Sequence, residues 1–178
     1  MQTPFIRSVS PRDLPAIALL EAEAFPGDPW SEALLRQALT HETTIFLAAF
    51  PEGSQTDTVY VPEMTDALHT QAMTDLPASP PVAYCILRTI LGEGSIDNIC
   101  VADAYRRQGI ARVLLTSGMK QAAERYGASV FTLEVRISNT PARGFYESLG
   151  FVNEGIRPSY YTHPREDAVI YRLQNAPV

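Results

Sequence analysis

The sequence contains few of the residues that bind metals or form disulfides, with two cysteines and three histidines in 178 residues. Cys85 and Cys100 stand in separate apolar segments, without C-x-x-C spacing and without a neighbouring histidine. The histidines are scattered and make no ligand set. The pattern therefore predicts no metal site. It favours two buried, reduced cysteines in a cytoplasmic protein over a disulfide pair.

Long apolar runs and an excess of basic charge are also missing. No run approaches the roughly 18–20 apolar residues that a membrane-spanning helix needs. The segment Met1 to Arg7 lacks the charged head and apolar core of an export signal. The formal net charge is −6, whereas a protein that binds nucleic acid usually presents a basic face. The sequence thus predicts neither a membrane nor a nucleic-acid partner, and its acidity is compatible with a basic peptide partner.

What remains is the composition of an ordinary globular protein, 46% hydrophobic and 19% charged. A chain of this length is typical of one domain, so we expect residues 1–178 to form a single unit. Strand and helix patterns alternate along it, which predicts an α/β fold with one sheet and helices on both faces. Residues 51–80 interrupt this pattern. They are acidic, rich in proline and poor in large apolar residues, and they predict an insertion or long loop.

The boundaries of the expected elements follow from apolar periodicity and from turn residues. The expected strands are 5–9, 44–50, 82–90, 95–101, 129–135, 151–156 and 168–173. Helices are expected after Asp13, after Ser31, after Gly109 and from Thr140, and the third of them ends at Tyr126-Gly127. In that third helix, Val113, Leu114 and Met119 are expected to face the sheet. Gly92-Glu93-Gly94 is expected to be a hairpin turn.

The most informative segment is the turn between the strand ending at Val101 and the helix beginning after Gly109. A strand, a glycine-centred turn and a helix N-terminus leave backbone N–H groups without partners, with the positive end of the helix dipole behind them. Such a turn suits a phosphate or pyrophosphate. Gly109 lets the backbone approach the ligand, and the small Ala111 avoids crowding it. We call this segment the anion cradle; it comprises Arg106, Arg107, Gln108, Gly109, Ile110, Ala111 and Arg112.

Taken alone, the anion cradle is a weak signal. Its spacing differs from the GxGxxG of a dinucleotide site and from the GxxxxGK[ST] of a P-loop. An ordinary strand-to-helix turn with a solvated basic face explains the same residues.

Longer stretches of the chain resemble the GNAT acetyltransferase superfamily. The similar runs are Arg106-x-x-Gly109-x-Ala111, Leu133 to Asn139, Phe145 to Phe151, Tyr160-Tyr161, Arg165 to Ala168, Ala24 to Pro26 and Pro29 to Ser31. Within the superfamily these runs are similar to those of the bacterial ribosomal-protein alanine N-acetyltransferases. The resemblance covers residues 1–50 and 82–173 and leaves the insertion at 51–80 unexplained.

The resemblance implies a single mixed, mostly antiparallel sheet that splays open between the strands ending at Val101 and Val135. Acetyl-CoA would lie in this split as co-substrate, with its pyrophosphate on the anion cradle. The pantetheine arm would pair with the backbone of Ile99, Cys100 and Val101. Asn139 would also contact the cofactor.

Transfer of an acetyl group from a thioester to an amine needs a neutral amine, a donor for the developing oxyanion and a proton for the departing thiolate. The pKa of an α-amine is about 7.7–8.0, so a modest base suffices. We assign Glu134 as this base, acting directly or through a water, because partial burial in an apolar strand would raise its pKa. Tyr146 would be the general acid and would also contact the cofactor. A backbone N–H of residues 99–101 would stabilise the oxyanion.

Both assignments have structural alternatives. Glu134 could be a solvent-face residue or could only orient the peptide. Tyr146 could be a core aromatic of its helix.

The acceptor that the resemblance implies is the N-terminal amine of a small-subunit ribosomal protein that begins with alanine followed by basic residues. Trp30, Tyr160 and Tyr161 are candidates for the peptide channel, although aromatic loops also serve to close a fold. Two other functions stay open. One is acetyl transfer to a small amine or to a lysine side chain, and the other is acyl-CoA binding without catalysis.

Acidic residues near the N-terminus could complement a basic acceptor. These are Glu21, Glu23 and Asp28, which a solvated helix face explains as well.

Overall fold

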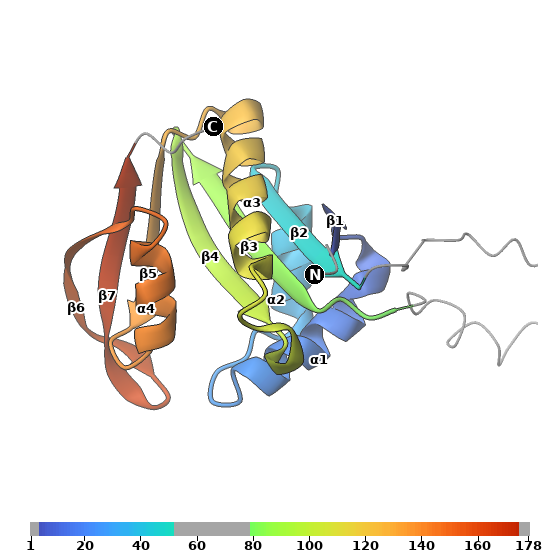
Figure 1. Ribbon diagram of the computed structural model, residues 1–178, viewed down its shortest axis with the longest axis horizontal. Coiled ribbons are helices and arrows are strands. Elements are labelled where there is room, and N and C mark those ends of the chain that lie inside the picture. Colours follow the sequence, from blue (N-terminus) through green and yellow to red (C-terminus); the bar gives the residue numbers. More distant parts are fainter. Residues whose placement is uncertain (1–3, 52–78, 175–178) are drawn as a thin grey trace, which may run out of the picture.

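The computed structural model describes residues 4–51 and 79–174, and Figure 1 shows their arrangement. The strands are β1 (Phe5–Ser8), β2 (Thr44–Phe50), β3 (Ala83–Ile90), β4 (Glu93–Val101), β5 (Val130–Arg136), β6 (Val152–Thr162) and β7 (Arg165–Gln174). The helices are α1 (Leu14–Ala24), α2 (Glu32–Thr40), α3 (Ile110–Tyr126) and α4 (Thr140–Glu147), with 3-10 turns at Pro11–Asp13 and Asp103–Tyr105. Most of the predicted insertion lies outside the described residues.

The seven strands form one sheet in the order β1-β2-β3-β4-β5-β7-β6. Every neighbouring pair is antiparallel except β4 and β5, which are parallel. The predicted α/β class, with a mixed and mostly antiparallel sheet, is therefore confirmed.

Side chains alternate between the two faces of the sheet, as the pleat of a strand requires. On β2, Ile45 and Leu47 belong to a buried cluster that includes residues of α3 and α4. Phe46 and Ala48 belong to a second cluster that includes residues of α1 and α2. Figure 1 shows α3 in front of the sheet and α2 behind it. The prediction of helices on both faces is thus confirmed.

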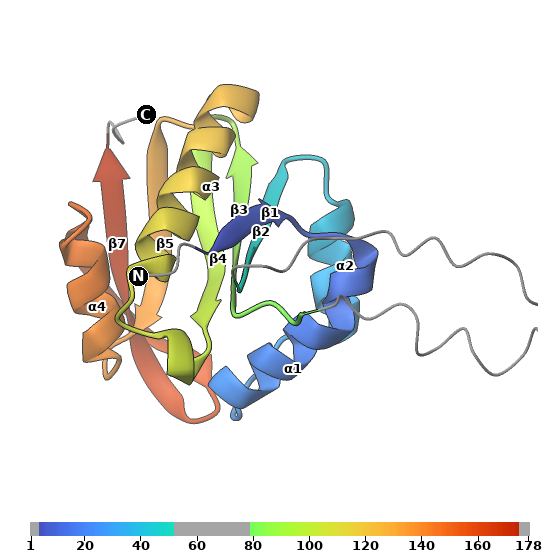
Figure 2. The same cartoon turned by 45° about the vertical axis from the view of Figure 1, so that its right-hand side comes forward.

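The sheet opens at its centre, between the two parallel strands. Their pairing covers Glu93, Gly94 and Ser95 of β4, opposite 130–132 of β5. Beyond this point the two strands, both fully described, no longer pair with each other. Figures 1 and 2 show β4 curving away from β5. The central splay expected from the resemblance is present, and it leaves the later part of β4 with an open backbone edge.

A bulge lies in β4 just where the strands separate. Opposite β3, Ile86 pairs with Asn98 and the next residue, Leu87, pairs with Ile96. Asp97 is therefore the extra residue, and such bulges bend a strand and redirect its side chains.

Two sequence expectations about turns and strand ends were wrong. The β3–β4 turn is Leu91-Gly92, with φ of 51° and 81°, and Glu93 already belongs to β4. Two successive positive φ angles are the requirement of a tight hairpin turn, and sequence reasoning did not expect a leucine there. The last two strands are also longer than predicted, because their pairing continues past a bulge to Thr162 and Arg165.

The side chains of α3 differ from prediction at one position. Leu114 and Met119 are buried as expected, whereas Val113 is 46% exposed and Leu115 is buried instead. Cys85 and Cys100 are both buried and unbridged, as predicted.

Within residues 4–51 and 79–174, no helix is long and apolar enough to cross a membrane. These residues also contain no group of three or more acidic, histidine or cysteine side chains placed to hold a metal ion.

Candidate active site

The backbone of the anion cradle is open to a ligand. α3 begins at Ile110, and Gly109 precedes it in a left-handed conformation, with φ of 82°. No atom lies within 4 Å of the position that a Cβ would take on Gly109. The first N–H groups of a helix have no partner inside that helix. Arg107 is also left-handed, with φ of 63°, and the Gln108 amide donates to the carbonyl of Ala104. This free space beside unpaired N–H groups fits a phosphate or pyrophosphate.

Two arginines of the cradle are engaged with the fold. Arg106 donates from Nε to the carbonyl of Val101 at 3.1 Å and forms an ion pair with Asp103 at 2.7 Å. Arg112 donates to the Ser148 hydroxyl at 2.8 Å and so joins α3 to α4. Arg106 and Arg112 therefore bring positive charge to the cradle while they are bonded to neighbouring groups of the fold.

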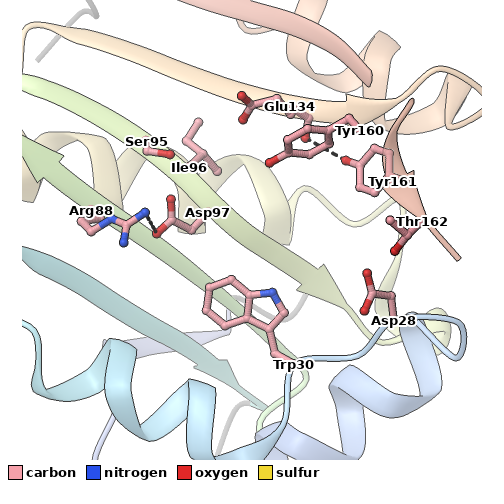
Figure 3. Close-up of a pocket in the computed structure, with 10 residues that line it drawn as sticks. All are labelled: Asp28, Trp30, Arg88, Ser95, Ile96, Asp97, Glu134, Tyr160, Tyr161 and Thr162. Carbon is pink, nitrogen blue, oxygen red and sulfur yellow. Dashed lines mark hydrogen bonds and ion pairs between the residues drawn. The ribbon is translucent and has the colours of Figure 1, made fainter. Parts of the chain in front are cut away.

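A cavity of about 690 Å³ lies beside the split, on the face of the sheet that α1 and α2 cover. Its lining residues come from the α1–α2 loop, β3, β4, β5 and β6: Asp28, Trp30, Arg88, Ser95, Ile96, Asp97, Glu134, Tyr160, Tyr161 and Thr162. Figure 3 shows Glu134 and the two tyrosines on one side, with Trp30 and Asp28 opposite. The cavity thus brings together five residues predicted for catalysis or acceptor binding: Asp28, Trp30, Glu134, Tyr160 and Tyr161.

Glu134 reaches this cavity from β5, and its side chain is 25% exposed. Its neighbours Leu133 and Val135 point the other way, into the core with α3. The Arg157 guanidinium on β6 forms an ion pair with the Glu134 carboxylate at 2.8 Å. The expected partial burial is present, and Arg157 is a neighbour that sequence spacing did not predict.

The tyrosine pair on β6 is held in place by β5. Tyr161 donates its hydroxyl proton to the carbonyl of Glu134 at 3.3 Å, and Arg136 lies 4.1 Å from the centre of its ring. Burial, together with the neighbouring Tyr160, raises the pKa of Tyr161 to about 12. The Arg157 guanidinium lies over the Tyr160 ring at 5.2 Å. A raised pKa keeps the hydroxyls of both tyrosines protonated beside the cavity.

Tyr146 lies on α4, in the core on the α3 side of the sheet, and is 6% exposed. Its ring packs against Phe145, Phe151 and Tyr171, with centroids 5.3, 5.7 and 6.3 Å away. Burial raises its pKa well above the usual range for tyrosine. Because Glu134 faces the cavity, the two predicted catalytic side chains lie on opposite faces of the sheet.

Asn139 has a structural role of its own. Its Oδ1 accepts a hydrogen bond from the Ala142 N–H at 3.2 Å and so caps α4. The predicted cofactor contact would be additional to this cap.

Sequence reasoning missed several residues of the cavity. Asp97 forms an ion pair with Arg88 at 3.3 Å, and burial raises the pKa of the Asp97 carboxyl. An aspartate inside the apolar run Ile96-Asp97-Asn98-Ile99 was the available signal, since a buried acid in a strand marks a candidate site. Nothing in the sequence around Arg88 indicated that it belongs to the cavity.

The parallel strands β4 and β5 pair at one end and separate at the other, and the helix between them in the chain, α3, has an open first turn. Together these features define the fold of an acyl-CoA-dependent N-acetyltransferase. Residues 36–151 match the Acetyltransferase (GNAT) family, and the chain belongs to that family. Acetyl-CoA is the co-substrate of this family, and solved structures with the same fold contain CoA or acetyl-CoA.

Individual relatives agree with this assignment. The ribosomal protein bS18-alanine N-acetyltransferase of Haemophilus ducreyi is 43% identical over 95 residues, which are 52% of this chain and 65% of that protein. The match thus spans slightly less than two thirds of that relative. The crystal structure of the Escherichia coli ribosomal-protein-S18-alanine N-acetyltransferase is 30% identical, with a TM-score of 0.73, covering 99% of this chain and 96% of that one. Arabidopsis thaliana NAA60 with acetyl-CoA shares the fold, at 16% identity, a TM-score of 0.75 and coverage of 97% and 98%.

The open space at Gly109 gives a direct test of the anion cradle. Gly109→Val should weaken acetyl-CoA binding by about tenfold or more, because the side chain enters the space beside the N–H groups and disfavours the left-handed backbone. Isothermal titration calorimetry measures the affinity.

Gly127 provides the matched control for this variant. It caps the other end of α3 with φ of 67°, and a side chain there would also enter open space. Gly127→Val should therefore lower the melting temperature as much as Gly109→Val does, but leave acetyl-CoA affinity unchanged. Equal affinities in the two variants would show that the turn does not hold the phosphates.

Proposed function

We propose that this protein transfers the acetyl group of acetyl-CoA to the α-amine of a protein N-terminus, and that its acceptor is the alanine N-terminus of ribosomal protein bS18. The observation that carries the proposal is the acidic, tyrosine-lined cavity that meets the split from the face opposite Tyr146. The likeness to ribosomal-protein alanine N-acetyltransferases supports the choice of acceptor. The cytoplasmic location expected from the sequence goes with such an acceptor.

The cavity suits a cationic chain end that must lose a proton. Asp28, Asp97 and Glu134 line it with carboxylates, and Arg88 is already paired with Asp97. A protonated amine is therefore attracted to the cavity. Trp30 offers it an aromatic wall, and a cation close to an aromatic face is stabilised.

Glu134 takes the proton of the amine, so that the nitrogen lone pair can form the new bond to the acetyl carbonyl carbon. Its ion pair with Arg157 is open to exchange, because the Arg157 side chain is 50% exposed. The incoming ammonium group replaces the guanidinium as the partner of the carboxylate.

Tyr146 and the backbone at the open edge of β4 act on the thioester in the same reaction. The Tyr146 hydroxyl gives its proton to the sulfur as the thioester bond breaks. A backbone N–H of residues 99–101, on the open edge of β4, donates to the carbonyl oxygen as negative charge develops there. The nitrogen loses its second proton as the amide forms, and a proton passed through water restores the Tyr146 hydroxyl, while Glu134 releases its proton to solvent. The products are an N-acetylated chain and a free thiol, so no covalent enzyme intermediate is needed.

Thiol release from acetyl-CoA with a panel of short peptides tests the proposal. We expect turnover of a peptide that begins with alanine followed by basic residues, with mass spectrometry locating the acetyl group on the α-amine. The same peptide with its α-amine already acetylated is the control and should give no turnover.

Other acceptors distinguish the remaining functions. Turnover of spermidine or of an internal lysine, without turnover of the free α-amine, would replace the proposed acceptor. Acetyl-CoA binding without turnover of any acceptor would remove the catalytic proposal and leave the family assignment.

A further inference from the structure

Glu21 is a buried carboxylate that the proposed chemistry does not use. It lies on α1 and is 1% exposed. Three donors converge on it: the Trp30 backbone N–H at 2.9 Å, the Asn98 side-chain amide at 3.1 Å and the Tyr84 hydroxyl. The expectation that Glu21 complements a basic acceptor is therefore wrong, since its oxygens are occupied inside the protein.

The partners of Glu21 belong to different walls of the acceptor cavity. Trp30 lines the cavity from the α1–α2 loop, and its own backbone N–H is the group that Glu21 holds. Asn98 follows Asp97, the bulged residue that lines the cavity from β4. Both bonds end on the same oxygen, Oε1. One buried atom therefore connects two walls that are far apart in the sequence.

The third bond anchors this connection to the centre of the sheet. Tyr84 on β3 is 0% exposed, and its hydroxyl donates to Oε2 of Glu21. Burial and the adjacent Glu21 raise the pKa of Tyr84 far above its usual range, so the hydroxyl stays a donor. Since a carboxylate can only accept hydrogen bonds, it suits three donors better than any neutral side chain does.

We propose that Glu21 is a positioning residue that fixes the spacing between the Trp30 wall and the Asp97 wall, and thereby sets the affinity for the acceptor. This inference rests on the proposed function, because it takes the cavity to be the acceptor site. Glu21 itself does not touch the acceptor. Its loss leaves buried donors without partners, and the loop that carries Trp30 relaxes outward.

The fluorescence of Trp30 reports this loop directly, because Trp30 is the only tryptophan in the chain. In Glu21→Leu, which removes all three acceptor bonds, quenching of Trp30 by acrylamide should rise by about twofold or more as the loop relaxes. Glu21→Gln should stay near wild type, since its amide oxygen can still accept from Trp30 and Asn98. Glu124→Leu removes the same charge at the exposed end of α3 and should leave quenching unchanged.

Steady-state kinetics tests the functional half of the inference. Glu21→Leu should raise KM for the alanine-led peptide by about tenfold, the effect of losing roughly one good hydrogen bond, with kcat within about twofold. The dissociation constant of acetyl-CoA should not change, because none of the three hydrogen-bond partners of Glu21 belongs to the anion cradle. A general loss of structure would instead lower kcat and raise the dissociation constant of acetyl-CoA as well.

Asn98→Ala keeps the inference testable if Glu21→Leu does not fold. It frees the β4 wall while Glu21 still holds Trp30, so KM should rise by about threefold with little change in quenching. Unchanged KM in Asn98→Ala, or unchanged quenching in a folded Glu21→Leu, would overturn the inference. If wild type acetylates no peptide, a rise in quenching still establishes the link from Glu21 to Trp30, whereas the acceptor role of both is then rejected with the proposed function.

Discussion

Glu134→Gln should lower kcat/KM for the peptide acceptor by about a hundredfold or more at neutral pH, within the usual range for loss of a general base. Glutamine keeps the shape of the side chain and can still contact Arg157, but it cannot accept the proton of the amine. The α-amine has a pKa of about 7.7–8.0, so more of it is neutral without help as the pH rises. The ratio of wild-type to variant activity should therefore shrink between about pH 7 and pH 9, as measured by initial rates at subsaturating peptide.

A second ion-paired glutamate on the same sheet gives the control for this experiment. Glu154 on β6 contacts Arg172 at 3.7 Å, lines no part of the cavity and is 45% exposed. Glu154→Gln should leave kcat/KM within about twofold of wild type. If Glu134→Gln raised KM but kept kcat, Glu134 would orient the peptide, which is the alternative that the sequence left open.

Local features of the site could be predicted from the sequence because they depend on neighbours in the chain. Gly109 before an apolar helical stripe predicts a glycine-centred turn and a helix N-terminus, and α3 begins directly after Gly109. Ser31 predicts a helix start, and its hydroxyl accepts from the Leu34 N–H. β2 has the predicted bounds, because its apolar run ends at a proline.

Features that depend on distant segments could not be predicted in this way. The residues next to Glu21 in the sequence are equally compatible with a glutamate on an exposed helix face. Glu21 is buried because Tyr84 and Asn98, which are distant in the sequence, donate hydrogen bonds to it. The pairing of Arg157 with Glu134 depends on β6 lying two strands from β5, with β7 between them. No periodicity within either segment contains that information.

Glu134 and Tyr146 lie on opposite faces of the sheet because Glu134 is on β5 and Tyr146 is on α4, which packs on the other face. The side chains of β5 alternate, so Glu134 faces the cavity while Leu133 and Val135 enter the core that contains Tyr146. Under the proposed function, this separation across the sheet would let the acceptor approach from one face while the thioester sulfur lies toward the other. A proton can then leave the amine and another reach the sulfur without the two groups competing for the same space.

Tyr146→Phe should lower kcat by about a hundredfold or more while the dissociation constant of acetyl-CoA stays within about twofold, because only the proton donor is lost. Burial raises the pKa of Tyr146, which keeps its hydroxyl protonated. The same core raises the pKa of the Cys85 thiol to about 12. A thiolate formed in such surroundings is also much more basic than in water, so a buried phenol is a suitable donor for it.

Tyr171→Phe is the matched control for Tyr146→Phe. Its ring packs against that of Tyr146 in the same core, but its hydroxyl donates to Glu147 at 2.5 Å, away from the proposed chemistry. We expect kcat close to that of wild type for Tyr171→Phe, and a circular dichroism melt that stays cooperative for both variants. Stopped-flow measurement of the first turnover separates the chemical step from product release. Equal first-turnover rates in Tyr146→Phe and wild type would make Tyr146 a core aromatic, and the proton for the thiolate would then have to come from water.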